Sequence, residues 1–411
     1  MENSLRFHLH NIKLFGFAIS LIGSGFSISL CGIGLGIYGF AFLCDYIMRK
    51  ETQFKRPLIP AHMLLGILLT SLFISLALSD YFAVSLKGYF KYVQSFGLLY
   101  AGIDSIRSKI DLKIILFCVL GVYITAVLDA LYQCLNGADI FFGRTREIYN
   151  VDRNIYRLTG PYKQSTDFGT FLATGIPVVV TSIAWFWIKG KRALAALVAL
   201  VSVCMVYVLL GTLSRGALFA LFVGLFVLIL HLRLRWYYLG VLLISLLVLM
   251  LVPSVISERM SQLMSGGSSP ERVLLITIVF DMIQASPFFG LGLNTYSINF
   301  PLFKPEEYTA LMYAHNGYLQ IAAEAGCAGI LLYISFIGAL LFKIRQYVMQ
   351  QVEAADIILG LGLLAGIVTL LTNGLFESVF QSTQLRTLLW VMLGIASSFA
   401  YRVKRSSNQG E

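Results

Sequence analysis

The sequence predicts an all-α fold, a polytopic membrane protein of about 12 transmembrane helices with one long polar loop that contains short helices. Hydrophobic residues make up 58% of the 411 residues and charged residues only 13%, whereas a soluble domain has about 25% charged residues. The mean hydropathy is +0.79. Apolar runs recur along the chain, and each is close to the roughly 20 residues that a helix needs to cross a bilayer.

The apolar runs define the expected helices and the division of the chain. Their expected limits are 13–28, 30–47, 59–78, 84–104, 113–135, 164–188, 193–212, 215–232, 236–255, 315–342, 355–373 and 383–401. Residues 1–255 would carry the first nine helices, residues 256–314 the loop, and residues 315–411 the last three helices and a tail, all in one integral-membrane domain. The N-terminal apolar stretch has no convincing small-residue cleavage site, so we expect it to remain as the first helix.

The distribution of Lys and Arg predicts the orientation. The net charge is +10, but the basic residues form short clusters between spans, which is typical of membrane orientation and not of a nucleic-acid surface. The clusters share one side if there are about 12 spans. They are Arg49-Lys50, Lys55-Arg56, Arg107/Lys109/Lys113, Lys189/Lys191/Arg192, Arg233/Arg235, Lys343/Arg345 and Arg402/Lys404/Arg405. This side and both termini are therefore expected in the cytoplasm, with loop 256–314 on the extracytoplasmic side.

A second set of cations lies on the expected extracytoplasmic side, against the orientation bias. These residues are Lys87, Lys91, Arg144, Arg146, Arg153, Arg157, Lys163, Arg215, Arg259, Arg272 and Lys304. They suggest an anionic ligand on that face. For any single residue the alternative is loop solvation or contact with lipid headgroups.

Two of these cations stand in motifs next to spans. Arg157 precedes the turn residues Gly160-Pro161 before the sixth span; its guanidinium could bind a phosphate through two hydrogen bonds or serve as an interfacial anchor. Arg215 follows Ser214 at a junction with almost no loop. An Arg at the bilayer edge is costly unless it reaches the interface, pairs or binds a ligand, and the N–H groups that open the eighth span also favour an anion.

The long loop contains a predicted surface helix that is followed by a turn. Ser269-Pro270-Glu271 is typical of a helix start. The following residues Arg272, Leu275, Ile276 and Phe280 have helical spacing. Residues 286–292 include Pro287, Gly290 and Gly292, which predict a turn; a lone Gly-x-Gly does not indicate a phosphate-binding loop.

The end of the loop carries the candidate acid–base residue. His315 stands at the mouth of the tenth span, where it could take a proton from a hydroxyl at neutral pH. Asn316, Gln320 and Glu324 follow at intervals of four and share one helix face. A polar stripe of this kind faces the bundle interior or a wet cavity; the alternative role for these three residues is hydrogen bonding between helices.

Metal-ligand and hydrolase motifs are absent from the sequence. The six Cys residues lie in or beside apolar segments without Cys-x-x-Cys or Cys/His spacing, and we interpret them as packing residues. His8, His10, His62 and His231 are weak candidates. Glu377 and Arg386 bracket the last extracytoplasmic turn and are candidates to pair.

Taken in order, the motifs resemble the O-antigen ligase family and its polymerase relatives. The matching residues are Arg157 with Gly160, Ser214 with Arg215, Arg272 after Pro270-Glu271 with the turn 286–292, and His315-Asn316 with Glu324-Ala-Gly326. Lys91 matches a basic residue that some members carry in the fourth span. The motifs cover the C-terminal two-thirds of the chain, and their combination is more specific than any one of them. Asp167 departs from the pattern, since many relatives have Asn there.

The resemblance implies an inner-membrane enzyme whose active site faces the periplasm under the long loop. Ligases of this family transfer O-antigen polysaccharide from undecaprenyl pyrophosphate to a hydroxyl of lipid A–core oligosaccharide, by a metal-independent inverting displacement and without a cofactor. By this resemblance His315 and Arg215 are catalytic, and Arg157, Arg272 and Lys91 bind the donor pyrophosphate. Five residues would support them, namely Asn316, Gln320, Glu324, Ser214 and Gly160.

Three alternatives remain open from the sequence. An O-antigen polymerase would use the same donor with a lipid-linked glycan as acceptor. A protein O-oligosaccharyltransferase would use a protein hydroxyl. A polysaccharide transporter would predict inverted repeats, broken helices and charges near the middle of the membrane.

Overall fold

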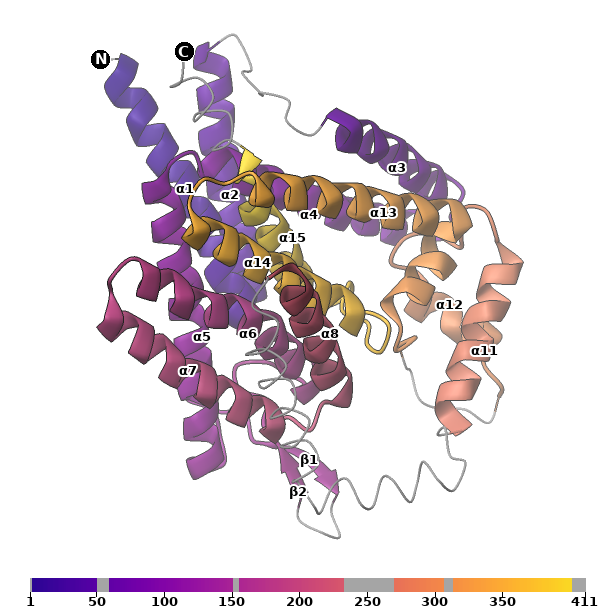
Figure 1. Cartoon of the computed structure of the whole chain (residues 1–411). Helices are drawn as coiled ribbons and strands as arrows, with labels where there is room; N and C mark the ends of the chain where they lie inside the picture. Colours follow the sequence, from indigo (N-terminus) through magenta and orange to yellow (C-terminus); the bar gives the residue numbers. More distant parts are fainter. Residues whose placement is uncertain (1, 50–58, 151–154, 233–269, 307–312, 401–411) are drawn as a thin grey trace.

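The computed structural model describes residues 2–49, 59–150, 155–232, 270–306 and 313–400 (Figure 1). These residues form 13 helices and one two-stranded antiparallel sheet. Seven of the helices are long and apolar enough to cross a membrane, and Ala61–Ala77, Arg215–His231 and Val273–Ala285 are shorter apolar helices. The prediction of an all-α polytopic membrane protein is confirmed in this part of the chain.

The helices coincide with the predicted spans. They are α1 (Glu2–Phe26), α2 (Ile28–Arg49), α3 (Ile59–Ala77), α4 (Phe82–Ser105), α5 (Lys109–Asn136), α6 (Ser165–Ile188), α7 (Arg192–Gly211), α8 (Arg215–His231), α13 (Gly317–Met349), α14 (Ala354–Asn373) and α15 (Thr383–Ser397). Most ends agree with the prediction to within about four residues, a difference that fraying at helix ends readily accounts for. The exceptions are α1, which begins well before residue 13, and α13, which runs beyond residue 342. The predicted span 236–255 lies outside the described residues.

Local sequence sets several helix ends. Ser108 Oγ accepts a hydrogen bond from Asp111 N (3.1 Å), and the Asp111 carboxylate accepts one from Ser108 N (2.8 Å), so that α5 begins in a capping box. The same helix ends at Gly137, whose φ of 86° lies in the left-handed region. Apolar length therefore selects the segment, and polar or glycine caps set where it starts and stops.

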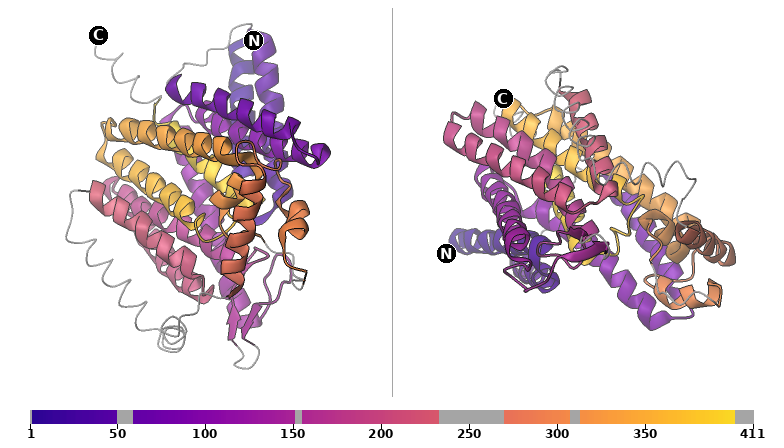
Figure 2. Two further views of the ribbon diagram at one scale, coloured as in Figure 1. Left: turned by 90° about the vertical axis from the view of Figure 1, so that its right-hand side faces the viewer. Right: turned by 90° about the horizontal axis from the view of Figure 1, so that it is seen from below.

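The helices pack into one bundle, in which α14 lies against α6 and α8, and α15 lies against α4 and α1. Helices α1 and α2 form a closely packed hairpin, because a Cβ on Gly34 would lie only 2.4 Å from Ser20 N. Strands β1 (Glu147–Asn150) and β2 (Ile155–Arg157) form a small hairpin between α5 and α6. In two perpendicular views, this hairpin and the N-terminus lie at opposite ends of the molecule (Figures 1 and 2).

The helix connections with basic clusters lie at one end of the bundle, as the distribution of Lys and Arg predicts. At the end that carries the basic clusters, called the basic end below, Glu353 pairs with both Lys109 and Lys189. At the opposite end, Leu158 N donates to Gly211 O (3.0 Å), which joins the residues after β2 to the end of α7. The two groups of loops are thus separated by the length of the bundle.

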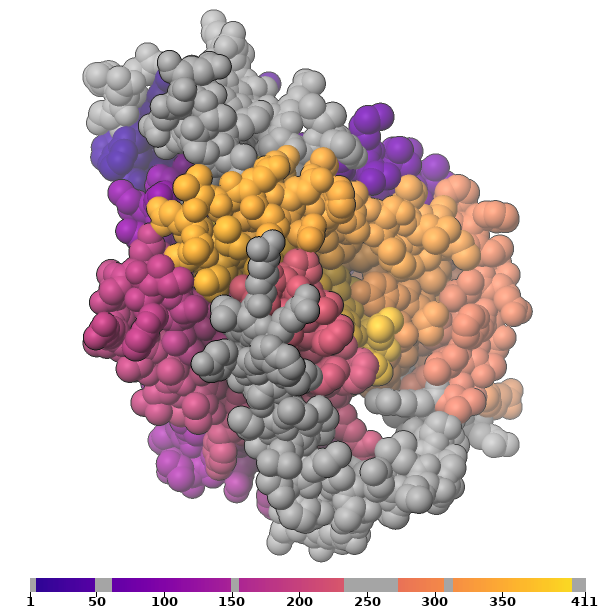
Figure 3. Space-filling model, in the orientation of Figure 1, coloured from indigo at the N-terminus to yellow at the C-terminus, as the bar shows by residue number. Residues whose placement is uncertain are grey.

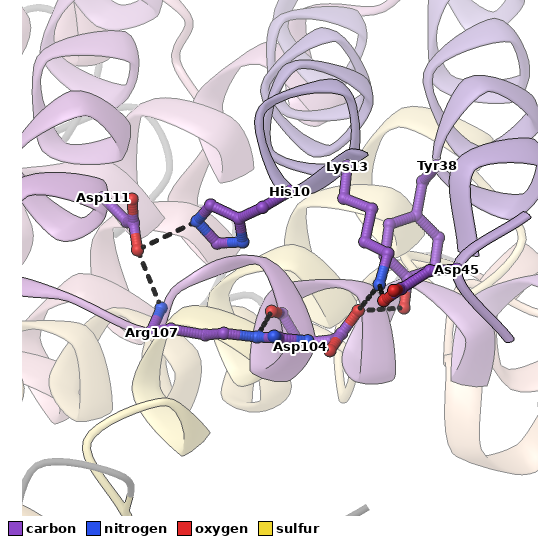
Figure 4. Close-up of polar contacts among 7 residues, drawn as sticks. All are labelled: His10, Lys13, Tyr38, Asp45, Asp104, Arg107 and Asp111. Atoms are coloured by element: carbon purple, nitrogen blue, oxygen red, sulfur yellow. Dashed lines mark hydrogen bonds and ion pairs between the residues drawn. The ribbon is translucent and has the colours of Figure 1, made fainter. Parts of the chain in front are cut away.

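A buried ion-pair network joins the first helices at the basic end (Figure 4). Lys13 of α1 is 2% exposed. Its Nζ lies 2.6 Å from Asp45 of α2 and 3.0 Å from Asp104 of α4. Asp104 also pairs with Arg107. Buried charges of this kind need their partners, so the network fixes how α1, α2 and α4 meet.

The loop helices are α11 (Pro270–Ala285) and α12 (Tyr296–Phe303), next to the start of α13 (Figure 3). The predicted helix is present as α11, and its predicted capping residue Ser269 lies outside the described residues. Of the apolar residues at helical spacing, Leu275 is buried, whereas Ile276 and Phe280 are exposed. The residues that pack against α12 and α13 are Leu275, Ile278, Val279 and Met282. The helix buries the side that meets its neighbours, and sequence spacing does not show where those neighbours lie.

Helix α13 is broken at Gly326, where φ is 70° and ψ is −179°. The predicted turn at 286–292 fills the break and supplies the hydrogen bonds that the helix loses. These are Leu291 N to Ala323 O (3.0 Å), Gly292 N to Glu324 O (3.0 Å) and Cys327 N to Pro287 O (2.8 Å). Gly290 and Gly292 have φ values of 71° and 112°, so the turn is confirmed and its glycines have a backbone reason. The polar stripe residues Gln320 and Glu324 lie on the short first part of α13, Gly317 to Ala325.

Candidate active site

Arg157 ends strand β2 and lies against the start of α8. Its Nη2 donates to the Leu213 carbonyl (3.4 Å), and its Nη1 lies 3.8 Å from Glu147 Oε1 across the β hairpin. Burial lowers the pKa of the Arg157 guanidinium, and the carboxylates of Glu147 and Glu377 offset part of that effect. The guanidinium is thus held in a half-buried place within electrostatic range of Glu377.

Gly160 shapes the loop that follows Arg157. Its φ is 49°, and an added Cβ would lie 2.6 Å from the Phe168 ring. Gln133 of α5 holds this loop, because its Oε1 accepts from both Thr159 N and Gly160 N (3.0 Å each). A side chain at position 160 would therefore displace the loop that sets the position of Arg157.

Ser214 caps α8, and Arg215 is the first residue of that helix. Ser214 Oγ accepts from Ala217 N at 3.4 Å, and the Arg215 side chain is exposed. The next residue, Gly216, packs against the segment after α14, where an added Cβ would lie 2.9 Å from Asn373 Oδ1 and 3.1 Å from Phe376 Cβ. The start of α8 therefore sits beside the segment that carries Glu377.

His315 directly precedes α13 and faces Glu377. Its Nδ1 lies 3.2 Å from Glu377 Oε2, and the two side chains are 41% and 17% exposed. The φ of His315 is 46°, a left-handed conformation that is uncommon outside glycine and that clusters at functional sites. Asn316 is the N-cap, since its Oδ1 accepts from Tyr318 N and Leu319 N (3.0 Å each). The cap fixes the backbone from which the imidazole projects.

The segment between α14 and α15 holds the start of α13. Gly317 N donates to Gly374 O (2.8 Å) and to Glu377 O (3.2 Å). An added Cβ on Gly317 would lie 2.6 Å from the Phe380 ring. In Figure 3 this segment, in yellow, reaches the surface between α8 and α13. Backbone contacts therefore fix the distance between His315 and Glu377.

Lys91 lies in a second group of polar residues. Its Nζ donates to Asn294 Oδ1, and Asn294 N donates to Glu324 Oε2 (2.8 Å). Gln320 Nε2 donates to Glu324 Oε1 at 3.3 Å. Gln320 and Glu324 are each 3% exposed, so the predicted inward direction of the polar stripe is confirmed for these two residues. Asn316 caps the helix instead.

The structure brings most of the predicted residues together in two groups. Arg157, Ser214, Arg215, His315 and Asn316 converge on the segment between α14 and α15, while Lys91, Gln320 and Glu324 lie deeper along α13. Arg272 lies in the first turn of α11, and its side chain lies outside the described part of the structure. Asp167, the departure from the family pattern, accepts from Ser382 Oγ (2.9 Å) next to the same segment.

Glu377 is the residue whose role sequence reasoning missed. The sequence suggested that Glu377 pairs with Arg386. In the structure Glu377 pairs with His315, and Arg386 Nη1 donates a hydrogen bond to the Phe380 carbonyl at 3.2 Å. The position of Glu377, an acidic residue in the short turn between the last two spans, was the available signal. Its partner lies 62 residues earlier in the chain, so only the fold identifies it.

Comparison with known proteins finds one family that matches part of the chain. Residues 200–334 match the O-antigen ligase family model. The resemblance expected from the motifs is confirmed over these residues, which include Arg215, Arg272, His315 and Glu324. The family includes O-antigen ligases and polymerases, which are glycosyltransferase-like enzymes with lipid-linked polysaccharide substrates.

Two further comparisons give weaker results. No curated protein matches the chain. A solved chain described as "Structural coordination of polymerization and crosslinking by a peptidoglycan synthase complex" aligns with a TM-score of 0.44 and 16% identity, over 81% of this chain and 96% of that chain.

Proposed function

We propose that the protein is an O-antigen ligase of the inner membrane. It transfers O-antigen polysaccharide from undecaprenyl pyrophosphate to a hydroxyl of lipid A–core oligosaccharide, on the periplasmic face. In this proposal the basic end faces the cytoplasm, about 12 helices span the bilayer, and loop 256–314 covers the site. The observation that carries the proposal is the His315–Glu377 pair, held at 3.2 Å beside the cations Arg157 and Arg215.

The imidazole of His315 is arranged to accept a proton from the acceptor hydroxyl. A carboxylate on Nδ1 favours the tautomer with its proton on Nδ1, which leaves the Nε2 lone pair for the substrate. The same carboxylate stabilises the imidazolium that forms when the proton arrives. Glu377 thus acts through His315, as a positioning residue.

The displacement needs positive charge at its other end. The acceptor oxygen forms a bond to the anomeric carbon, the bond from that carbon to the pyrophosphate breaks, and the electron pair leaves with the pyrophosphate. Arg157 and Arg215 would stabilise that developing charge, as preorganised cations in a partly desolvated site do. Attack from the face opposite the leaving group inverts the configuration at the anomeric carbon.

Deletion of the gene in a strain with smooth lipopolysaccharide tests the proposal. Loss of a ligase leaves bare lipid A–core at the surface while long polymer accumulates on undecaprenyl pyrophosphate. Loss of a polymerase, the nearest alternative within the family, instead leaves core capped by one repeat unit. Normal lipopolysaccharide together with loss of glycans from proteins would point to the protein O-oligosaccharyltransferase alternative and overturn the ligase assignment.

Complementation of the deletion with variants tests the residues. Arg215→Ala and His315→Ala should fail to restore transfer, although both proteins insert in the membrane at normal levels. Restored lipopolysaccharide with either variant would remove that residue from the mechanism. The break in α13 is a feature that the transporter alternative also predicts, but its backbone groups are occupied by the turn 286–292.

A further inference from the structure

Arg386 of α15 is a buried cation without an acidic partner in the described residues. It is 8% exposed, and its Nη1 donates to the Phe380 carbonyl at 3.2 Å. A guanidinium inside a membrane bundle is costly, and such residues are retained where they pair or bind a ligand. One backbone carbonyl accepts from only one of its five N–H donors.

The packing of α4 on α15 places Arg386 beside Lys91. The two helices meet at two levels: an added Cβ on Gly102 would lie 2.6 Å from Gly394 Cα, and the Phe96 ring lies 4.9 Å from the Trp390 ring. From the first of these levels to the second, residue numbers change in the same direction in both helices, so α4 and α15 run parallel. One further turn in this register brings Lys91 to the level of Arg386, and the two side chains are close enough to act on each other electrostatically.

Positive charge exceeds negative charge in this deep group. Lys91 and Arg386 supply two cations, and Glu324 supplies one carboxylate that is bridged to Lys91 through Asn294. Gln320 Oε1 is buried and has no hydrogen-bond partner in the described part of the chain. A buried acceptor without a partner is rare in folded proteins. A ligand that is anionic and also carries a hydroxyl would satisfy both the cations and this oxygen.

The deep group is separate from the His315 site. Helix α13 begins at Gly317, and Glu324 follows seven residues later, which corresponds to about 10 Å at 1.5 Å per residue; His315 lies beyond the start of the helix. A single pyrophosphate does not span that distance. Lys91, which the family resemblance places on the same pyrophosphate as Arg157, thus lies in a group of residues apart from His315.

We infer that Lys91 and Arg386 form a second anion site, inside the bundle, that binds the phosphate group of a membrane lipid. The expected occupant is the polyprenyl pyrophosphate, an assignment that rests on the proposed function. A phospholipid headgroup has the same phosphate chemistry and would be recognised by the same two cations. The site lies between α4, α13 and α15, below the level at which His315 meets the acceptor.

Binding measurements on the purified full-length protein test this inference. The protein is purified in dodecyl maltoside, a detergent without phosphate, and binding of undecaprenyl pyrophosphate is measured by microscale thermophoresis. The measurement is made in a background that carries Arg157→Met and Arg215→Met, which removes the cations of the His315 site. In this background Arg386→Met should weaken the remaining binding at least tenfold, whereas Arg386→Lys, which keeps the charge, should change it no more than a few-fold. Arg192→Met is the matched control, because Arg192 is exposed at the basic end.

Stability and competition separate the possible outcomes. Thermal unfolding without ligand reports whether Arg386→Met disturbs the fold; if it does, the half-buried Lys91→Met takes its place in the binding measurement. Competition by phosphatidylglycerol would support the site and assign it to bulk phospholipid, whereas resistance to it would assign the site to the polyprenyl carrier.

Two negative results have different meanings. Unchanged affinity when Arg386→Met or Lys91→Met is added to the background without Arg157 and Arg215 would overturn the second site and leave the proposed function intact. Failure of the wild-type protein itself to bind undecaprenyl pyrophosphate would instead overturn the proposed donor.

Discussion

At the scale of single residues, the pairing of His315 with Glu377 gives the site its direction. A histidine at the mouth of a membrane helix has many possible roles. The carboxylate 3.2 Å from Nδ1 leaves Nε2 as the nitrogen that can meet a substrate. The left-handed backbone at His315 and the cap by Asn316 hold the ring in that direction. The proposed proton transfer to His315 therefore depends on Glu377, which lies in the connection between α14 and α15.

Replacing Glu377 by Gln should lower transfer activity without loss of protein from the membrane. The amide cannot stabilise an imidazolium and can hold the wrong tautomer, so we expect kcat to fall by about 10²- to 10⁴-fold, as such changes do in related dyads. Transfer is measured in vitro with lipid-linked polysaccharide and lipid A–core. The KM for the donor should change little, since Glu377 acts through His315.

The exposed Glu306 provides a matched control for that prediction. Glu306→Gln makes the same chemical change just after α12 and should keep wild-type kcat. Equal activity of Glu377→Gln and Glu306→Gln would show that the carboxylate does not serve His315.

The roles of individual residues were predictable only where they depend on local sequence. Ser214 and Arg215 at a helix start, and His315 at another, follow from hydropathy and motif order. Asn316 was expected on the polar stripe but serves as a cap, because residues at the first turn compete for free backbone N–H groups. Glu377 needs the turn after α14 to be folded against α13, a contact between distant segments that no local pattern encodes.

At the scale of elements, the break in α13 is the feature that positions both polar groups. The helix stops at Gly326 and its free backbone groups bond to the turn 286–292. The same turn leads to Asn294, which links Lys91 to Glu324. The turn that fills the break, called the plug below, thus sets the relation between the loop helices and the membrane helices.

Gly290→Ala should disrupt this plug and destabilise the protein. Gly290 has a φ of 71°, and its added Cβ would lie 2.4 Å from the Glu324 carbonyl carbon and oxygen, so neither the backbone nor the space accepts a side chain. We expect a loss of about 1–3 kcal/mol, seen as a lower thermal midpoint in detergent by fluorescence-detected size exclusion.

Gly338→Ala is the control with the opposite expected sign. It lies in the regular part of α13 with nothing within 4 Å of an added Cβ, and Ala is favoured over Gly in a helix by about 1 kcal/mol. Its thermal midpoint should stay equal or rise. A fall of the same size in both variants would mean that α13 tolerates no added methyl group, and the plug would have no special role.

Helix bounds were largely predictable from sequence, and the break was not. The spans can be located in the sequence because crossing a bilayer requires an apolar segment of a certain length, and because Lys and Arg flank such segments on the cytoplasmic side. Gly326 stands in a continuous apolar run, and glycine is common in membrane helices. Its positive φ exists because the turn 286–292 competes for the backbone of α13, and hydropathy carries no sign of that competition.

At the scale of the whole molecule, charge is buried at the basic end as well as near the site. The Lys13 network joins α1, α2 and α4 through two carboxylates and one ammonium. Its partners lie 32 and 91 residues apart from Lys13 in sequence. The N-terminal helix hairpin is thereby tied to the rest of the bundle by ionic contacts as well as by apolar packing.

Lys13→Met should destabilise the protein strongly, although Met replaces the methylene groups of the Lys13 side chain with an apolar side chain of similar size. The change leaves Asp45 and Asp104 buried without the ammonium, and removal of one partner from a buried ion pair costs about 3–5 kcal/mol. The measurement is the thermal midpoint of the purified protein. Adding Asp45→Asn to Lys13→Met should recover part of the loss, and no recovery would show that the carboxylate is not the source of the cost.

A pH dependence is expected from Glu353, which joins two loops at the basic end. Hydrogen bonds from Lys109 and then Lys189 lower the pKa of Glu353 from 4.5 to about 2. A carboxyl whose pKa is lowered in the folded state adds stability that is present above its unfolded pKa and is lost as the pH falls towards its folded pKa. For this exposed cluster the contribution is about 1 kcal/mol or less.

Glu353→Gln should therefore lower the thermal midpoint slightly at pH 7 and at pH 5, and the difference from wild type should narrow below pH 4.5. By pH 3 more than half of the difference should be gone, because the wild-type carboxyl is then largely protonated in the unfolded chain. Glu306→Gln, at an exposed site of the opposite end, should show no such narrowing. A difference that stays constant from pH 7 to pH 3 would mean that the amide disturbs packing at the start of α14, and that the two lysines do not hold the loops together through charge.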